Sequence, residues 1–528
     1  MSFRGVGGTD MGAGKSAGRE KLRSPRPCGQ YLPGDREMEQ HVMATPRERA
    51  AACLGIGTDA IEDDLAGFID ETHDTLLRAR AGSGKTTALI IKIAHLVLDR
   101  GVPPEQILAV TFNNAAARQL EARLLAAGLG DRVRVRTFHA LAQRIVRAHF
   151  GPARRAVFDQ TGEDGVRVRE IVEEAIDQVA TESFFHFCAS RMRMPYRKRR
   201  EYIESVGRDA LLSATNFLRA RGYGLQNRYE QAWEDGGPIA GNAMKAARAI
   251  DLGLKEAGLI DGSAVLGAAA WTLERELERG AARASEAHDT QFVLIDEFQD
   301  CSAPYLRLIS AIRDINSGAT TIIGVGDDWQ AINGFAGADL AFFDEPERLM
   351  MSPVRHDLLR NRRSGAEIVA WGNRVMGEMG CLDGPAVAAP ERGAGCIAQM
   401  HLGAGRDIAY TAERLATRVS DEADSLALIA RRWKVGDLSL RALASRVEAR
   451  VKERGWAGSV RGITAHGAKG LEFDQVLLLD DGSFPLEHPA RPIMAGLIPE
   501  EDYLREEACL RHVAGTRARD RLDEITIG

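Results

Sequence analysis

The sequence predicts an α/β protein built on parallel sheets. Short apolar runs alternate with segments whose apolar residues recur at helical spacing, and this order is typical of strands joined by crossover helices. Two clear helical segments are 85–98 and 115–127. The predicted strands are 75–79, 107–112, 133–138, 292–296, 320–325, 426–430 and 476–479.

A charged stretch, residues 151–285, interrupts this alternation. Its pattern is mostly helical, which predicts a helical insertion. The insertion contains a basic cluster, which is either a solvated helix face or a contact for duplex or single-stranded nucleic acid. The cluster consists of Arg191, Arg193, Arg197, Lys198, Arg199 and Arg200.

Composition narrows the class of protein. The 528 residues are 45% hydrophobic and 27% charged, as in soluble globular proteins. A net charge of −6 gives no basic footprint over the whole molecule, so any nucleic-acid contact needs a local groove. Seven cysteines without a CxxC pair argue against zinc and iron–sulfur sites. No apolar run is long enough for a transmembrane helix, so we expect a cytoplasmic protein without membrane contact.

Residues 1–45 are rich in Gly, Arg and Pro and lack periodicity, which predicts a disordered N-terminal segment. Within it, residues 12–16 look like the end of a phosphate-binding loop. No apolar strand precedes them and no apolar helix follows, and such a loop needs both to hold its turn rigid. We therefore do not expect this stretch to bind nucleotide.

The stretch 79–87 has the setting that 12–16 lacks, because it follows a predicted strand and opens a predicted helix. Its glycines let backbone N–H groups converge on phosphate, and the helix N-terminus favours an anion. Lys85 would reach the β- and γ-phosphates of ATP, and the Thr86 hydroxyl would ligate Mg²⁺. The predicted nucleotide contacts here are Ala81, Gly82, Ser83, Gly84, Lys85, Thr86 and Thr87.

Two adjacent acids follow the apolar residues of the strand 292–296. Asp296 would hold Mg²⁺, directly or through water, and Glu297 would orient and deprotonate the attacking water. Two carboxylates at the end of a buried strand are costly unless a cation compensates them. Together with the glycine-rich loop, they predict Mg²⁺-dependent hydrolysis of ATP.

Further motifs follow along the chain in a fixed order. They are 111–117 (TFNNAAA), 137–142 (TFHALA), 296–300 (DEFQD), 325–332 (VGDDWQAI), 361–364 (NRRS), 464–472 (TAHGAKGLE) and 513–518 (VAGTRA). With the glycine-rich loop, they resemble the UvrD/Rep group of superfamily 1 DNA helicases over residues 75–522, and 325–332 has the form seen in helicase IV relatives.

The resemblance implies two RecA-like cores that face each other across one ATP. The first core would comprise residues 70–150 plus 286–350, with 151–285 inserted in it, and the second core residues 351–528. Better-known relatives carry a second large accessory insertion just before the stretch 464–472. Here the preceding residues are typical of a single helix, 438–453, so that second insertion is expected to be absent or vestigial.

The resemblance also implies roles for single residues. Gln330 would sense the γ-phosphate and link the ATP site to the DNA groove. Arg363 and Arg517, from the second core, would act as arginine fingers on the transferring phosphoryl group. Glu472 would accept a hydrogen bond from the ribose. The predicted catalytic set is Lys85, Asp296, Glu297, Gln330, Arg363 and Arg517.

Contacts with single-stranded DNA are implied in the same way. Phe112 and Phe335 would stack on bases, with core packing as the alternative for each. Asn333 and Phe335 replace a tyrosine and a tryptophan that many relatives carry. The two histidines of the set have a purely structural alternative. The predicted groove residues are Phe112, Asn113, Thr137, His139, Phe335, Thr464 and His466.

The implied function is an ATP-dependent DNA helicase or translocase that moves 3′ to 5′ along single-stranded DNA. It would unwind duplex at single/double-strand junctions in DNA repair or recombination. One alternative is a DNA-gated ATPase or translocase that needs a partner protein such as a nuclease, for example in phage defence. Another is a non-catalytic scaffold, and the intact catalytic set argues against it.

Weak discrimination between ATP and GTP is the expected consequence of two departures from the family's pattern. Arg362 replaces the tyrosine that relatives stack on adenine, and residues 51–75 contain no glutamine to bind the base. We expect similar kcat/KM values for hydrolysis of the two nucleotides. A strong preference for ATP in steady-state assays would contradict this prediction.

Overall fold

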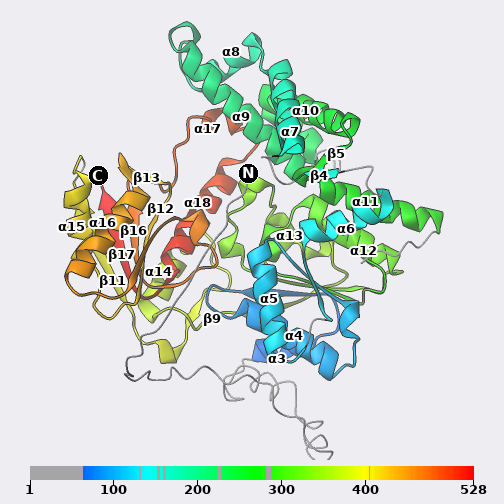
Figure 1. Ribbon diagram of the computed structural model, residues 1–528, viewed down its shortest axis with the longest axis horizontal. Coiled ribbons are helices and arrows are strands. Elements are labelled where there is room, and N and C mark those ends of the chain that lie inside the picture. Colours follow the sequence, from blue (N-terminus) through cyan, green and yellow to red (C-terminus); the bar gives the residue numbers. More distant parts are fainter. Residues whose placement is uncertain are drawn as a thin grey trace, which may run out of the picture.

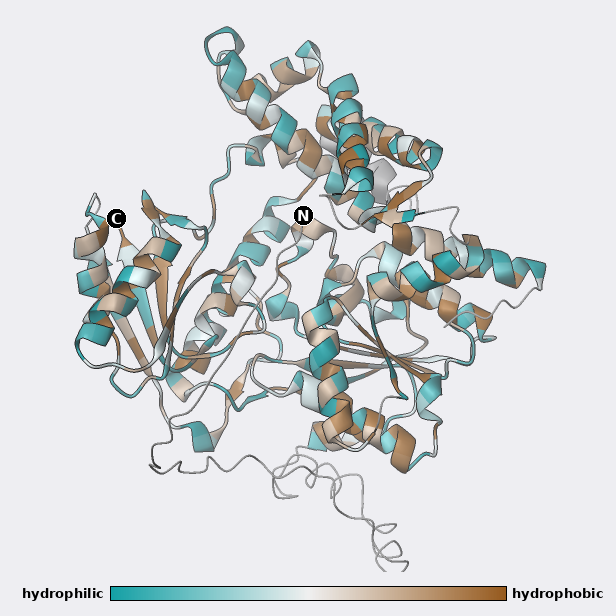
Figure 2. Cartoon of the chain, in the orientation of Figure 1, coloured by the Kyte–Doolittle hydropathy of each residue, from teal (hydrophilic) through white to brown (hydrophobic). Residues whose placement is uncertain are grey.

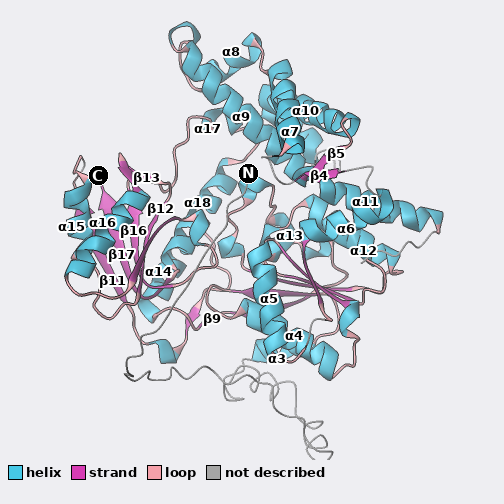
Figure 3. Cartoon of the chain, in the orientation of Figure 1, coloured by secondary structure: helices cyan, strands magenta, loops and turns pink. Residues whose placement is uncertain are grey.

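Two parallel sheets dominate the computed structural model, which describes residues 63–129, 132–150, 155–157, 162–222, 228–280, 287–403 and 405–528 (Figure 1, Figure 3). The predicted segment 1–45, including 12–16, lies outside the described residues. Among the helices that are described, none combines the length and the apolar character needed to cross a membrane.

The first sheet has six parallel strands and is covered on both faces, which explains why its inner strands are mostly apolar, whereas its two edge strands carry polar and charged residues. One face packs on α3, α4 and α5, and the other on α6, α11 and α12. The strand order is β3 (Arg134–Thr137), β2 (Ile107–Thr111), β6 (Phe292–Ile295), β7 (Thr321–Gly326), β1 (Thr75–Ala79) and β8 (Val354–Leu358). The helices are α3 (Asp63–Asp70), α4 (Lys85–Leu98), α5 (Asn114–Ala126), α6 (Phe138–Phe150), α11 (Gly262–Arg279), α12 (Ala303–Ile315) and the short α13 (Ala341–Asp344).

Two elements belong to the first core although the predicted boundaries placed them outside it. The strand β8 follows residue 350, where the second core was expected to begin, yet it pairs with β1 in the first sheet. The helix α11 falls within the predicted insertion 151–285, yet it packs between α6 and α12 in the first core. Sequence spacing alone does not show these partners, because both pairings join distant parts of the chain.

The second sheet has five parallel strands. Its order is β11 (Cys396–Leu402), β17 (Ala518–Ile527), β16 (Phe473–Asp480), β12 (Ser425–Ala430) and β15 (Ser459–Thr464). One face packs on α14 (Ala366–Gly377) and α18 (Glu500–Gly515), the other on α15 (Ile408–Ala416) and α16 (Leu440–Glu453). The strands β11, β15 and β17 were not predicted, because polar residues interrupt their apolar runs. Figure 2 shows both sheets as hydrophobic interiors beneath helices with hydrophilic outer faces.

The connection between β12 and β15 is short. It contains the hairpin of β13 (Lys434–Val435) and β14 (Leu438–Ser439), followed by α16, and all of these residues are described. The predicted helix 438–453 is therefore α16, and this connection holds no further large subdomain. Between the first and second sheets, β9 (Arg360–Asn361) pairs with β10 (Val387–Ala388).

The insertion forms its own helical layer, at the top of Figure 1. It contains α7 (Glu163–Val179), α8 (Glu182–Arg191), α9 (Arg200–Ala220) and α10 (Arg228–Glu256), with the short parallel pair β4 (Arg155–Val157) and β5 (Leu259–Asp261) at its base.

A segment of the second core reaches this insertion. The chain between β16 and α18 includes α17 (Arg491–Met494), which lies against α9 (Figure 1). Ala490, Ile493 and Leu497 are buried in the insertion's apolar cluster, and the Arg191 Nε donates to the Pro492 carbonyl oxygen at 2.7 Å. The insertion therefore contacts both cores.

Candidate nucleotide site and nucleic-acid groove

The glycine-rich loop lies between β1 and α4, at the contact between the two cores. Gly82 and Gly84 have φ angles of 72° and 98°, in the left-handed region that favours glycine. A Cβ on Gly82 would lie 2.6 Å from Asn361 Oδ1 and 2.7 Å from Arg363 Cβ. The Arg362 N–H also donates to the Gly82 carbonyl oxygen at 2.9 Å. The second core thus rests directly on the loop, and only glycine fits there.

Two of the loop's hydroxyl groups differ in their surroundings. Ser83 Oγ is buried without a hydrogen-bond partner among the described residues, as expected for a group that awaits a ligand. Thr87 Oγ1 instead accepts a hydrogen bond from Arg123 Nη2 at 2.7 Å, which ties α4 to α5.

The acids of the catalytic set follow β6 and face the loop. Lys85 Nζ lies 3.4 Å from Glu297 Oε2, and Gln299 Nε2 donates to the same oxygen at 2.5 Å. Burial would raise the pKa of Glu297, but Lys85 and a lysine of the second core, Lys469, hold it well below its usual range. For Asp296, burial and the adjacent Glu297 carboxylate raise the pKa above its usual range. The nearby lysines therefore stabilise the charged form of Glu297, whereas they do not offset the cost of burying a charged Asp296.

These acids fit a divalent metal that is shared with phosphate. No three acidic, histidine or cysteine side chains of the described residues form a metal cluster by themselves. Mg²⁺ commonly takes one or two protein ligands and completes its shell with phosphate oxygens and water. Asp296, buried and short of positive charge, and the Thr86 hydroxyl are the residues that would hold it.

Lys469 enters the site from the second core. It follows β15, and its Nζ lies 2.6 Å from Asp300 Oδ2 and 3.9 Å from Glu297 Oε2. It also donates to the Gln330 carbonyl oxygen at 3.1 Å. No role was assigned to Lys469 from the sequence, although a lysine in the middle of 464–472 offered a signal. The first core's acids are thus neutralised in part by the second core.

Arg517 and Gln330 meet between the cores. The Arg517 side chain is buried, donates from Nε to the Val513 carbonyl oxygen at 2.9 Å, and points Nη2 at Gln330 Oε1 at 3.5 Å. Burial, with Arg363 nearby, lowers the Arg517 pKa to about 9, so the guanidinium is still charged at neutral pH. Gln330 Nε2 donates to Asp327 Oδ2 at 2.5 Å.

Arg363 and Glu472 bind each other. Arg363 Nη2 lies 2.6 Å from Glu472 Oε1, and Arg519 Nη2 donates to the other carboxylate oxygen at 3.0 Å. Burial would raise the pKa of Glu472, but the two arginines keep it below its usual value. Arg363 lies beside the glycine-rich loop with its charge directed to Glu472, and both Glu472 oxygens accept from arginines in this arrangement.

Four of the predicted groove residues are held by the first core. Phe112 is half-buried against Phe138, with ring centroids 5.2 Å apart. Thr137 is buried, and its Oγ1 accepts from the Ala140 N–H at 3.2 Å. The His139 ring contacts the Gly262 carbonyl oxygen at 3.2 Å, and Asn113 caps α5 through its side chain. Each of these residues has a local structural partner in addition to its predicted DNA contact.

Phe335, Thr464 and His466 lie where the two cores meet. Phe335 is 60% exposed, and its ring packs edge-to-face with His466 of the second core, with centroids 5.5 Å apart. Thr464 ends β15, and its Oγ1 accepts from the Gly467 N–H at 3.3 Å. An exposed aromatic ring held between two cores is suited to stacking on a base.

Glu506 holds the turn that carries Phe335, and it was not predicted from the sequence. This residue lies on α18, and its Oε1 accepts from the Gly334 N–H at 3.0 Å. A Cβ on Gly334 would lie 2.6 Å from Glu506 Oε2, so a larger residue there would displace the Glu506 carboxylate. Burial, with Glu507 adding to it, raises the pKa of Glu506 to about 7.

Comparison with known families agrees with this geometry. Residues 66–350 match the model of the UvrD/REP helicase N-terminal domain, which covers more than half of the chain. The chain belongs to the UvrD/REP helicase family. Residues 426–526 match the UvrD-like helicase C-terminal domain, so each RecA-like core has its own family match. The predicted family and fold class are confirmed.

Several helicases resemble the chain over different lengths. DNA helicase IV of Escherichia coli strain K12 is 27% identical over 494 residues, which cover 86% of this chain and 66% of that protein. DNA helicase II of the same organism is 29% identical over 60% of this chain and 40% of its own length. The ATP-dependent DNA helicase PcrA of Leuconostoc citreum is 47% identical over 94 residues, 17% of this chain and 13% of PcrA. The chain therefore spans less than two thirds of the length of these relatives.

Glu506→Gln should stabilise the protein above pH 7 and change little near pH 5. The carboxyl has a pKa of about 7 when folded and about 4.5 when unfolded, so the wild type loses stability as the pH rises from about 4.5 to about 7. The glutamine variant cannot ionise and escapes this loss. Urea unfolding midpoints at pH 5 and pH 8 measure the effect, with Glu501→Gln on the exposed face of α18 as the control. Equal shifts for both variants would contradict the assignment.

Proposed function

We propose that this protein is an ATP-driven motor that moves along single-stranded DNA in the 3′ to 5′ direction and unwinds duplex during DNA repair or recombination. The observation that carries the proposal is the contact between the cores at this site, where Lys469 lies beside Glu297 and Arg517 beside Gln330. A site assembled from both cores changes when the cores move, so hydrolysis and movement are linked.

Each catalytic residue would act at a stated atom. The glycine-rich loop and Lys85 would bind the β- and γ-phosphates, and Glu297 would accept a proton from the attacking water. When bound by Thr86 and Asp296, Mg²⁺ would neutralise phosphate charge. Arg517 would approach the γ-phosphate beside Gln330. Further catalytic and ribose contacts require Arg363 and Glu472 to exchange their mutual ion pair for the nucleotide.

The DNA would lie over the groove residues of both cores. Phe335 and His466 already touch across the interface, so closure of the cores sets their spacing. Stacking on an aromatic ring contributes about 1–3 kcal/mol per base and tolerates any sequence. We therefore propose binding of single-stranded DNA with little sequence preference.

A second candidate function follows from the short connection between β12 and β15. With only β13, β14 and α16 there, the motor lacks the accessory subdomain that better-known relatives carry at this point. In this alternative the chain is a DNA-gated ATPase or translocase that unwinds only with a partner protein such as a nuclease. Unwinding assays with and without a partner candidate distinguish the two functions.

Glu297→Gln should abolish hydrolysis while leaving ATP binding in place. Loss of the general base is expected to lower kcat by about 10²–10⁴-fold. Lys85→Ala should weaken ATP binding as well, because it removes the cation at the phosphates. Hydrolysis with and without single-stranded DNA measures both effects, and Glu278→Gln on exposed α11 is the control. A wild-type protein without DNA-stimulated hydrolysis would refute the motor function.

Charge reversal at the basic cluster should weaken duplex binding. The connection between α8 and α9 is exposed, and Arg197, Lys198 and Arg199 form no ion pair with any described residue. Binding through phosphates weakens with salt, and each cation that neutralises a phosphate adds about 1 to the slope of log affinity against log salt concentration. Lys198→Glu/Arg199→Glu should lower duplex affinity and reduce the salt slope by about 2.

The matched control for that experiment is Arg248→Glu/Lys255→Glu, on the exposed face of α10 in the same insertion. Fluorescence anisotropy over a salt series measures affinity and slope together. Equal effects of the two double variants would assign the loss to net charge and would refute a specific contact at the cluster.

A further inference from the structure

Arg80 is a fully buried arginine inside the glycine-rich loop, with 0% of its side chain exposed. Nη1 donates to Asp327 Oδ1 at 2.8 Å and to Asp328 Oδ1 at 2.7 Å. Nη2 donates to the Asp383 carbonyl oxygen at 2.7 Å, and Nε to the Gly384 carbonyl oxygen at 2.6 Å. The guanidinium thus has acceptors on three sides, in a part of the chain where a small residue would suffice to bind phosphate.

These acceptors come from both cores. Asp327 and Asp328 follow β7 in the first core, and the turn at Asp383 and Gly384 follows α14 of the second core. Trp329, next along the chain, places its ring 3.8 Å from the Arg80 guanidinium carbon. We call Arg80 with these four acceptor residues the Arg80 clasp.

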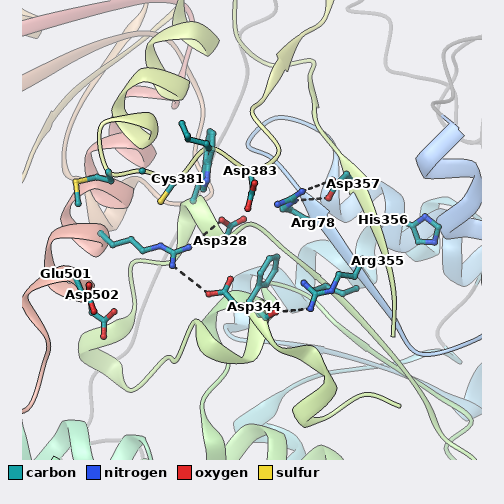
Figure 4. A pocket seen from close by; sticks show the side chains of 17 residues that line it. Arg78, Asp328, Asp344, Arg355, His356, Asp357, Cys381, Asp383, Glu501 and Asp502 are labelled. Atoms are coloured by element: carbon teal, nitrogen blue, oxygen red, sulfur yellow. Dashed lines mark hydrogen bonds and ion pairs between the residues drawn. The ribbon is translucent and has the colours of Figure 1, made fainter. Parts of the chain in front are cut away.

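The neighbourhood of the clasp is a cleft between the cores, shown in Figure 4. Asp383 and Asp328 lie next to each other there, with Arg78 and Asp357 beside them (Figure 4). Arg78 pairs with Asp357 at 2.7 Å, and a Cβ on Gly384 would lie 2.7 Å from the Arg78 guanidinium carbon. The second-core turn therefore rests closely on β1 and needs a glycine to do so.

Two short series of hydrogen bonds connect the Arg80 clasp to the nucleotide site. Asp327 accepts from Arg80 on one oxygen and from Gln330 on the other, and Gln330 faces Arg517. The Asp327 N–H also donates to Gln299 Oε1 at 2.9 Å, and Gln299 donates to Glu297. Asp327 thus connects Arg80 to Gln330 and Arg517 through its carboxylate, and to Gln299 and Glu297 through its backbone N–H.

The clasp also lies at the start of the segment that carries the groove aromatic. The chain runs from Asp327 through the buried Trp329 to Phe335, and the second core holds the far end through Glu506. Any shift of the second-core turn relative to Arg80 would therefore act on the segment that joins the nucleotide site to the groove.

We propose that Arg80 is a positioning residue that couples closure of the two cores to the nucleotide site, and this rests on the motor function proposed above. In the closed arrangement each of its three nitrogens donates a hydrogen bond, and two of the acceptors are second-core carbonyl oxygens. When the cores part, those two acceptors leave, while the pairs with Asp327 and Asp328 remain. Arg80 thereby favours the closed state, and it holds Gln330 in place through Asp327.

Lysine cannot replace this geometry. An ammonium group would keep a positive charge near the two buried carboxylates, but it lacks the planar fork that reaches acceptors on three sides. Arg80→Lys therefore tests the coupling with less risk to folding than Arg80→Ala, which leaves both carboxylates buried without their main cation. Gly384→Ala is a second test from the other core, because alanine at a φ of 59° is strained and would displace the turn while leaving Arg80 unchanged.

The experiment measures ATP hydrolysis by the full chain with and without single-stranded DNA, for the wild type, Arg80→Lys, Gly384→Ala and the double variant. Both single variants should reduce the ratio of stimulated to basal kcat by roughly 5- to 150-fold, the usual range of coupling between sites. The double variant should be no worse than the more affected single variant, because both break the same contact. Arg275→Lys, on exposed α11, should keep the wild-type ratio.

Hydrogen–deuterium exchange provides a readout that needs no hydrolysis. Residues 379–386 should exchange faster in Arg80→Lys than in the wild type and in Arg275→Lys. A wild-type stimulation ratio in both single variants, or additive losses in the double variant, would overturn the proposal, as would unchanged exchange at 379–386. If Arg80→Lys does not fold, the stimulation ratio of Gly384→Ala alone tests the proposal. Absence of any DNA-stimulated hydrolysis in the wild type would refute the motor function instead, and the exchange result would still decide whether the clasp exists.

Discussion

Buried negative charge at the ends of two neighbouring strands is the constraint on which this structure depends. After β6 come Asp296, Glu297 and Asp300, and after β7 come Asp327 and Asp328. Carboxylates taken out of water are stable only with cations or hydrogen-bond donors close by. The first core supplies Arg80 and Lys85, which are too few for five acids. The remaining positive charge comes from Lys469, Arg505 and Arg517 of the second core and from the metal that the site would bind.

Because the first core has too few cations for its acids, contact with the second core determines how well these acids are neutralised. Separation of the cores would remove Lys469 from Asp300 and Glu297 and leave the acids exposed to one another's repulsion. A bound nucleotide would bring negative charge of its own and would attract the same cations. Arg363 illustrates the exchange, because it lies beside the glycine-rich loop with its charge directed to Glu472. A bound nucleotide and the acids of the two cores would thus compete for the same few cationic side chains.

The sequence predicted what is local and missed what depends on distant contacts. The strand Thr75–Ala79 and the helix Lys85–Leu98 were predicted with the bounds that the structure has, because a continuous apolar run or a helical repeat marks them. The strands β15 and β17 were missed because charged residues such as Arg461 and Asp523 break the run, although the sheet accommodates them at its edge or through buried ion pairs.

The same distinction holds for the site. The glycine-rich loop and the acids after β6 could be named because their residue types are adjacent in the sequence. Arg80 and Glu506 could not be named, because each bonds to a partner more than a hundred positions away in the sequence. Arg80 did offer a weak signal, a bulky charged residue within a loop that favours small ones. For the groove residues, the structure shows positions and partners, and their contact with DNA stays a prediction.

The segment that carries α17 changes how the helical insertion can move. Through Ile493 and Leu497 it anchors the insertion to the second core, while β4 and β5 join the insertion's base to the first. Because the insertion is held by both cores, a change in the gap between the cores must turn or bend it. The exposed connection between α8 and α9 adjoins the α17 anchor, where Arg191 donates to the Pro492 carbonyl oxygen, so the second core carries the basic cluster with it when it moves.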